Sequence, residues 1–340
     1  MSGVGSRESG VGTIAAYTEG LGRVRRASWV VVGLWLSTLL VALPPALVLH
    51  GMIAGHLGAS LMADQAARGV NFDWWNEFLA QAAGVGQTFV PAIIGFAAVL
   101  DNASRIADGR ALAPALTAIV GVQILVSVFL AGGVLDRLAR DRRVGSHAFF
   151  SACGVWFFRF LRLGAIAALV YWALFAWLHP WLLDTLYTRW THDITVERTA
   201  FFARLGLYAV FTAILCSVNL LFDYAKIRAV VEDRRSMIGA FLAGARFVVR
   251  HPAKTLALYL LNAIVYLLVV GFYFLAAPGA SAPLAAFAVG QLYIVLRVLV
   301  RLQFAASQTA LFQGKLAHAG YVARPAPTWP DSPAAEAVAR

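Results

Sequence analysis

Six stretches of the sequence are apolar runs long enough to cross a lipid bilayer. A spanning α-helix needs about 20 apolar residues, and in lipid only helices or closed barrels satisfy every backbone hydrogen bond. Only 13% of the residues are charged, against about 25% in an ordinary soluble domain. We therefore expect an all-α fold, a polytopic membrane helix bundle with six transmembrane helices. The predicted spans are residues 27–50, 113–135, 156–178, 200–222, 255–277 and 284–306.

The distribution of Lys and Arg orients this bundle. Cytoplasmic loops carry an excess of these residues close to the ends of spans. If both termini are cytoplasmic, 18 of the 28 Lys and Arg fall in cytoplasmic segments and 5 in extracytoplasmic ones. Arg outnumbers Lys by 25 to 3, which is typical of a GC-rich bacterial genome. We therefore predict a multi-pass protein of the bacterial inner (cytoplasmic) membrane, with the N-terminus and the C-terminus in the cytoplasm.

The segments outside the spans differ in character. Residues 1–26 form a cytoplasmic N-terminal segment, and residues 307–340 form a cytoplasmic tail, which we expect to be disordered from about residue 322 because it is rich in Pro. Within the transmembrane domain, 27–306, the long insertion 51–112 is interpreted as an extracytoplasmic lid. The apolar run 88–100 inside this lid is short and contains Pro and Gly, which favours a re-entrant or interfacial segment.

Two long cytoplasmic loops share a pattern that indicates an internal repeat. An Asp-Arg-Arg triplet begins at Asp141 and again at Asp233, and an Ala-Phe pair follows at the same separation, at Ala148 and Ala240. Apolar residues of 236–250 recur on one helical face, which predicts an interfacial helix before the next span. The N-terminal segment repeats the Gly and Arg spacing of the second loop. We therefore predict three tandem hairpin-like units, each with a cytoplasmic interfacial helix.

The second loop ends in a motif that resembles a known group of proteins. The motif is Gly-x-Arg-x-x-x-Arg-His-Pro, at residues 244–252, directly before an apolar span. It looks like a group of bacterial six-span integral membrane proteins, which includes the membrane domain found fused to some glycerophosphodiester phosphodiesterases. The resemblance implies a six-span fold. The phosphodiesterase domain and its metal cluster have no counterpart in this sequence, so the resemblance implies no catalytic residue.

Four arginines near the predicted cytoplasmic ends of spans are the candidate site residues. Arg159 and Arg162 are three residues apart and Arg297 and Arg301 four apart, so each pair shares a helix face. Two guanidinium groups on one face suit a phosphate group, and Asp223 is the candidate internal counter-ion. These residues predict a lipid-headgroup site in the cytoplasmic leaflet. The alternative is that each arginine extends along its helix to the interface.

Several classes of chemistry find no support in the sequence. It has no nucleophile motif, Gly-rich phosphate loop or metal-ligand spacing, so we predict no catalytic residue, no metal and no cofactor. The basic residues flank apolar runs, which argues against nucleic acid as a partner. Amides within the spans are interpreted as interhelical hydrogen-bonding groups. They are Gln123, Asn219, Asn262 and Gln291.

The leading hypothesis is a non-enzymatic membrane protein that binds membrane lipids, anionic ones among them, or supports another protein of the envelope. The alternative is a transporter or lipid-handling protein with a cavity beneath the lid. A third hypothesis is an intramembrane enzyme. A polar cavity between the spans would favour the second hypothesis, and a converging set of titratable groups would favour the third.

Overall fold

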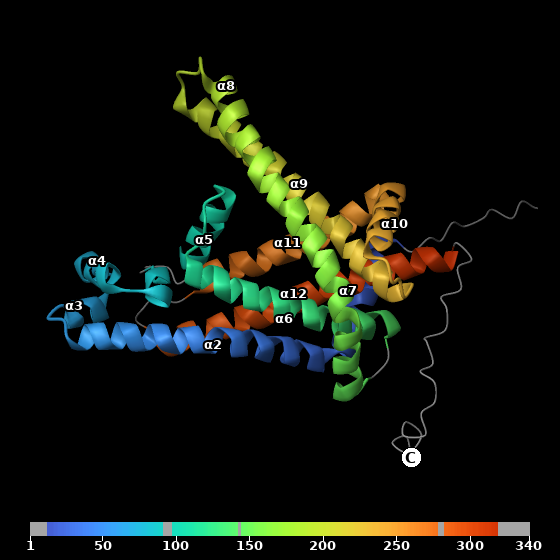
Figure 1. The fold of residues 1–340 in the computed structure, drawn as a ribbon, viewed down its shortest axis with the longest axis horizontal. Coiled ribbons are helices and arrows are strands. Elements are labelled where there is room, and N and C mark those ends of the chain that lie inside the picture. The colour runs from blue at the N-terminus through green and yellow to red at the C-terminus, as the bar shows by residue number, and fades with distance from the viewer. Residues whose placement is uncertain (1–11, 91–96, 142–143, 278–281, 319–340) are drawn as a thin grey trace, which may run out of the picture.

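The computed structural model describes residues 12–90, 97–141, 144–277 and 282–318. These residues form helices joined by short connections, with no strand among them (Figure 1). The six long helices are α2 (Ser28–Gly58), α6 (Pro114–Arg140), α7 (Ser146–Ala173), α9 (Glu197–Val231), α11 (Pro252–Ala276) and α12 (Pro283–His318). The shorter elements are α1 (Thr13–Arg26), α3 (Ala63–Arg68), α4 (Phe72–Gln81), η1 (Gly84–Thr88), α5 (Ala97–Ala107), η2 (Leu174–Leu178), η3 (Trp181–Leu186), α8 (Tyr187–Thr191) and α10 (Met237–Arg250).

Six helical runs are long and apolar enough to cross a membrane, which confirms the predicted fold class. One of them is the continuous run Ser146–Thr191, because π-helical turns join α7 to α8 without a break. Large apolar side chains cover the outer surfaces of these helices; Leu275 is 84% exposed and Phe287 is 66% exposed. Such surfaces are stable in lipid and unstable in water, so the chain is a multi-pass membrane protein.

Two helices extend beyond the predicted spans. The helix α2 continues to Gly58, so residues 51–58, which the sequence assigned to the lid, are the end of the first spanning helix. The helix α12 continues to His318, so residues 307–318 of the predicted tail are helical. Gly51 and Gly55 in α2 and Gly314 in α12 lie inside these extensions without ending the helices.

Two predictions fall wholly or partly outside the described residues. Of the short apolar run 88–100, residues 91–96 lie outside the described part, and α5 begins directly after them. The predicted disordered tail from residue 322 also lies outside it. These two predictions therefore stay predictions.

The lid folds back against the end of α2. Trp74 and Phe78 of α4 are buried, and Met52 and Leu57 of α2 pack against them. The side chain of Asn71 accepts a hydrogen bond from the backbone N–H of Trp74 at 2.9 Å and so caps α4.

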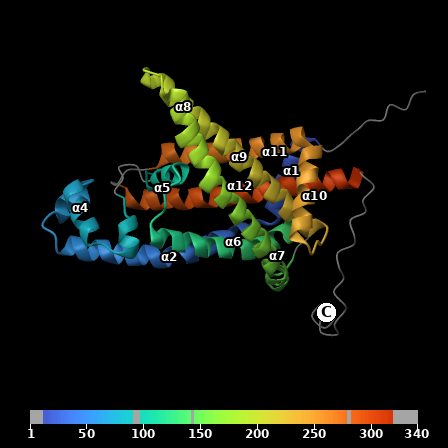
Figure 2. The same cartoon turned by 45° about the horizontal axis from the view of Figure 1, so that its top comes forward.

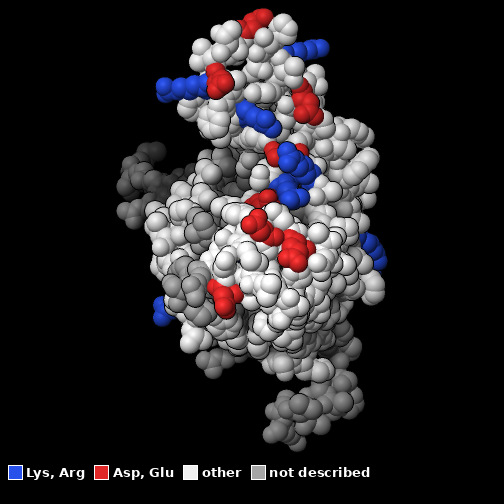
Figure 3. Space-filling view, turned by 90° about the vertical axis from the view of Figure 1, so that its left-hand side faces the viewer, with Lys and Arg blue, Asp and Glu red and all other residues white. Residues whose placement is uncertain are grey.

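Seen from the end of the molecule that carries the lid, acidic and basic groups follow one strip towards α8, and most of the remaining surface is uncharged (Figure 3). We call this the lid end, and we call the opposite end, near α1 and α10, the α10 end.

Three helix pairs dominate the packing and relate the units to one another. The helix α7 packs on α6, α10 packs on α9, and α1 packs on α12 (Figures 1 and 2). The three units run from α1 to α6, from α7 to α9 and from α10 to α12. The first helix of each unit therefore packs on the last helix of another unit, and α1 of the first unit packs on α12 of the third. Small residues allow these close contacts. A Cβ on Gly20 would lie 2.7 Å from the backbone of Ser307, and one on Gly244 would lie 2.9 Å from the backbone of Ala225.

The two repeated loops begin at aspartates with the same backbone conformation. Asp141 and Asp233 both have φ of 46°, in the left-handed region that non-glycine residues rarely adopt. Each carboxylate pairs with an arginine earlier in its own unit: Arg26 Nη2 lies 2.6 Å from Asp141 Oδ2, and Arg159 Nη1 lies 2.8 Å from Asp233 Oδ1. Partial burial opposes the ionisation of Asp141, but hydrogen bonding and the charge of Arg26 outweigh it and lower the pKa of this carboxyl. Equivalent residues thus make equivalent contacts.

The units differ at the start of their spans. A single residue separates α1 from α2, at Ala27, and another separates α10 from α11, at His251. Pro252 explains the second break, since it has no N–H to continue the preceding helix and disfavours helical backbone at the residue before it. In the middle unit no such break exists, and α7 runs continuously from Ser146 into the membrane. The predicted interfacial helix of this unit is therefore the first part of its spanning helix.

The last helices of the three units, α6, α9 and α12, contact one another in all three pairings. Around them, α2 packs on α6 and α12, α7 on α6 and α9, and α11 on α12. The two largest clusters of buried apolar residues lie towards the α10 end of this arrangement. The inner faces of α6, α9 and α12 therefore surround a common centre.

Candidate functional site

A cavity of about 530 Å³ occupies this centre. Five of the six spanning helices line it: α2, α6, α9, α11 and α12. Arg297 lies fourteen residues after Pro283, or about 21 Å along α12 at about 1.5 Å per residue. The hydrocarbon layer of a bilayer is about 30 Å thick, so the cavity lies within the membrane-spanning part of the bundle.

The helix α12 contributes two cations to the cavity. Arg297 and Arg301 are one helical turn apart and both line it. Both side chains are exposed, and both line the cavity. Among the described residues, neither arginine has a carboxylate within 4.0 Å. Arg297 interacts with the hydroxyl of Tyr293, one turn earlier on α12, and the charge of Asp223 reaches Arg301.

The helix α9 contributes an acid, a base and an amide. Lys226 Nζ lies 2.7 Å from Asp223 Oδ1, an ion pair within one helical turn. Asn219 Nδ2 donates to Asp223 Oδ2 and to the hydroxyl of Tyr259 on α11, each at 3.3 Å. With the two arginines of α12, three cations and one carboxylate line the cavity, which therefore carries an excess of positive charge.

Neutral polar groups complete the lining. On α6, Gln123 Nε2 donates to Ser127 Oγ at 3.5 Å. Ser37 and Thr38 on α2 also line it, and because both hydroxyls donate to Leu34 O, their oxygens keep the capacity to accept. On α12, Gln308 is only 1% exposed, and its Nε2 has no hydrogen-bond acceptor within the part of the chain that the structure describes. A buried amide donor without a partner costs about 1–3 kcal/mol unless water or a ligand satisfies it.

The lining residues of α6 and α9 occupy equivalent positions of the repeat. Ser127 precedes Asp141 by the same separation as Asn219 precedes Asp233. Since the two aspartates have the same backbone conformation and the same ion pair, this register aligns the two helices. The cavity thus takes one polar side chain from the same position of each unit.

The register extends to α12 through the close helix contacts. Ser307 faces Gly20 as Ala225 faces Gly244, so these two small residues are equivalent. Arg301 precedes Ser307 by the same separation as Asn219 precedes Ala225. The same position of the repeat, which lines the cavity, is therefore Ser127 in the first unit, Asn219 in the second and Arg301 in the third.

The structure separates the sequence-predicted site residues into two groups. Arg297, Arg301 and Asp223 line the same cavity. Arg159 and Arg162 do not. Arg159 pairs with Asp233 and lies over the ring of Trp156, 4.6 Å from its centroid, and Arg162 is exposed.

Sequence reasoning missed Lys226, Tyr259 and Gln308 as members of this site. It also treated the in-span amides as scattered structural groups. Two of them fit that interpretation: Gln291 accepts from the indole of Trp35 at 3.0 Å, and Asn262 donates to Ser307 Oγ at 3.1 Å. Counting back from Asp141 and Asp233 in the sequence would have shown that Ser127 and Asn219 are equivalent positions of the repeat and that both could face the same central cavity.

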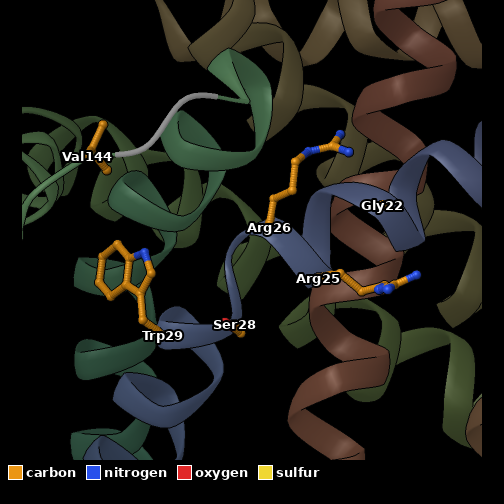
Figure 4. Close-up of a pocket in the computed structure, with 6 residues that line it drawn as sticks. All are labelled: Gly22, Arg25, Arg26, Ser28, Trp29 and Val144. Carbon is orange, nitrogen blue, oxygen red and sulfur yellow. The ribbon is translucent and has the colours of Figure 1, made fainter.

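A larger hollow of about 740 Å³ lies at the α10 end, where α1 meets α2. Its polar side chains do not converge. Arg26 points towards Asp141, which it binds with two hydrogen bonds, and Arg25 points away from Trp29 (Figure 4). We regard this hollow as a surface feature of the junction and not as a binding site.

Other clusters of polar residues are structural. Within the described residues, no three His, Cys, Asp or Glu side chains are grouped so that they could hold a metal ion. His179 forms a hydrogen bond of 2.7 Å between its Nε2 and the carbonyl of Ala107, and the hydroxyl of Tyr208 donates to Asp108 Oδ1 at 2.6 Å. These two bonds tie the segment between α5 and α6 to the hairpin of α7 and α9.

Together, the fold and the site define a multi-pass helical membrane protein with a polar, positively charged cavity between its spans. Comparison of the chain with protein-family models, with curated proteins and with solved structures finds no match.

Proposed function

We propose that this protein is a non-enzymatic lipid-binding protein of the bacterial cytoplasmic membrane, and that its central cavity holds the headgroup of an anionic phospholipid. One observation carries the proposal. Arg297 and Arg301 project into a polar cavity, and neither has a carboxylate partner among the described residues. Two guanidinium groups on one helix face form a strong donor set for a phosphate group.

Energetics favour an anionic ligand over simple extension of the arginines to the interface. A cationic side chain near the middle of a bilayer costs about 2.5–3.5 kcal/mol. An arginine that extends to the interface lowers this cost by following the lipid-facing surface of its helix. Arg297 and Arg301 instead face the centre of the bundle, where an anion offsets both charges at once.

The proposed orientation puts the cavity near the cytoplasmic leaflet. We propose that both termini are cytoplasmic, as the excess of Lys and Arg at that side favours. Arg301 lies five residues before residue 306, the predicted inner end of its span, or about 8 Å at about 1.5 Å per residue. A headgroup of the cytoplasmic leaflet is therefore the nearest source of phosphate.

Native mass spectrometry tests this proposal. The full chain is released from nanodiscs that contain phosphatidylglycerol and phosphatidylcholine, and the retained lipids are counted. We expect Arg297→Gln with Arg301→Gln to reduce retention of the anionic lipid at least tenfold, since charge-assisted hydrogen bonds contribute about 1.5–3 kcal/mol each.

The matched control is Arg159→Gln with Arg162→Gln. It removes the same charge from another spanning helix without touching the cavity. This variant should retain phosphatidylglycerol as the wild type does. Equal retention in the wild type and in a folded Arg297→Gln, Arg301→Gln variant would contradict the proposal and leave extension to the interface as the sufficient explanation.

A lipid-handling or transport function is the second candidate, and the position of the cavity favours it. The last helices of all three units meet there, so a movement of one unit would change the shape of the cavity. Proteoliposomes that contain a fluorescent phosphatidylglycerol on one leaflet test this function. Movement of the lipid between leaflets that depends on Arg297 and Arg301 would support transport, and the absence of movement would leave binding alone.

A further inference from the structure

The remaining polar groups of the cavity narrow the class of headgroup, if the cavity binds a phosphate as proposed above. The cavity is not symmetric. The cations of α12 lie on one side, and Asn219 and Asp223 of α9 lie on another. A ligand that fills the cavity meets both sides, so groups beside the phosphate must suit an amide and a carboxylate.

The carboxylate of Asp223 is not a site for a cationic headgroup. Lys226 already neutralises it at 2.7 Å, and the charge of Arg301 also acts on it. An ammonium or choline group in the cavity would meet three cations and no free negative charge. Zwitterionic headgroups are therefore disfavoured on electrostatic grounds.

Asp223 and Asn219 nevertheless have hydrogen-bonding capacity left. A carboxylate has about four lone-pair sites. Oδ2 of Asp223 receives one long bond, of 3.3 Å, from Asn219. The side-chain oxygen of Asn219 accepts no hydrogen bond within the described part of the chain. These oxygens can accept hydrogen bonds from neutral donors, which is the chemistry that recognises hydroxyl groups.

Gln308 supplies an independent sign that the cavity is built for an oxygen-rich ligand. Its Nε2 is buried, has no acceptor among the described residues and belongs to a side chain that lines the cavity. A phosphate or hydroxyl oxygen would satisfy this donor.

We propose that the ligand is a polyol phosphate, with its phosphate between Arg297 and Arg301 and its hydroxyls donating to Asp223 and Asn219. Phosphatidylglycerol presents this chemistry within the membrane, and free glycerol phosphate presents it from the cytoplasm. Leu34, Leu130 and Phe304 line the cavity beside the polar groups and give an apolar wall that suits the esterified form.

The test compares two anionic lipids that share a phosphate. Nanodiscs contain equal amounts of phosphatidylglycerol and phosphatidic acid, and native mass spectrometry of the full chain measures which one is retained. Phosphatidic acid carries the greater negative charge but no polyol, so charge alone favours phosphatidic acid. The inference predicts at least a threefold preference for phosphatidylglycerol, because one or two hydroxyl hydrogen bonds contribute this much.

Two amide variants show whether the preference arises in the cavity. Asn219→Leu should abolish it while leaving the retention of phosphatidic acid intact. Gln291→Leu removes an amide from a spanning helix outside the cavity and should leave the preference unchanged.

The outcomes separate this inference from the proposed function. Equal retention of the two lipids, or preference for phosphatidic acid, with dependence on Arg297 and Arg301 would overturn the polyol assignment and leave anionic-lipid binding standing. Retention that ignores both arginines would overturn the proposed function itself. Added glycerol 3-phosphate shows whether the natural ligand is a lipid or a soluble polyol phosphate. Displacement of phosphatidylglycerol supports a soluble polyol phosphate, and no displacement at millimolar concentration supports the lipid.

Discussion

The contact between α1 and α12 is the point at which the third unit closes on the first, and Gly20 makes it possible. In Gly20→Ala the new Cβ would lie 2.7 Å from Cα and N of Ser307. Ordinary contact begins at 3.4 Å, so α1 would have to retreat by about 0.7 Å. Backbone atoms cannot rotate away as the end of a side chain can, so the substitution has to separate the two helices.

The size of the effect follows from two opposing contributions. Overpacking of this kind lowers the free energy of unfolding by about 1–3 kcal/mol. Replacing Gly by Ala inside a helix raises it by about 0.5–1 kcal/mol. The net loss lies between about 0 and 2.5 kcal/mol, with a central value of about 1 kcal/mol. Gly22→Ala, on the same helix, is the matched control. Its Cβ would meet first the Nη1 of Arg26, at 3.1 Å, which is the end of a flexible side chain.

Thermal unfolding of both variants in one detergent, followed by size-exclusion chromatography, measures the difference. We expect Gly20→Ala to unfold at a lower temperature than the wild type, and Gly22→Ala at the same or a higher temperature. The second unit offers a parallel pair, Gly244→Ala against Gly239→Ala, with the same expected order. A Gly20→Ala variant as stable as Gly22→Ala would refute the close contact and with it the closure of the three units.

Three further predictions concern the topology and one partly buried histidine. In a Cys-free variant, Trp190→Cys should react with an impermeant thiol reagent added from outside, and Arg235→Cys should not; outside labelling of position 235 would reverse the orientation. Gln87→Cys and Ala107→Cys should both label from outside, and labelling of 107 only after permeabilisation would mean that the intervening segment crosses the membrane. Burial lowers the pKa of His251 from its usual 6.5, helped by neighbouring basic residues, so the unfolded chain binds more protons at this site. Its contribution to stability should therefore be complete above about pH 6.5 and decline below it, and His251→Gln should flatten the fall in unfolding temperature between about pH 7.5 and pH 5.5.

The six spans were predictable because each is a continuous apolar run, and only helices satisfy backbone groups in lipid. Their ends were less predictable. Pro44 and Pro45 lie inside α2 without ending it, and the helix continues to Gly58. The apolar pattern marks where a helix enters lipid, whereas the helix itself ends where backbone hydrogen bonds stop. These two points differ by several residues in α2 and in α12.

The candidate site was predictable only in part. Arg297 and Arg301 share a helix face by spacing alone, so their common direction could be predicted from local sequence. Their neighbours Asn219 and Asp223 come from another unit, and spacing along the chain says nothing about that contact. Arg159 shows the converse case. It also sits near the start of a span, but the repeated loop supplies Asp233 as its partner outside the cavity.

The claim that the cavity binds an anionic phospholipid is tested most directly by an experimental structure of the full chain in nanodiscs that contain phosphatidylglycerol. Single-particle cryo-electron microscopy at a resolution that shows side chains would suffice. We expect non-protein density between the guanidinium groups of Arg297 and Arg301, extending towards Asn219. A cavity in which both arginines bind Asp223 and no density lies between them would contradict it.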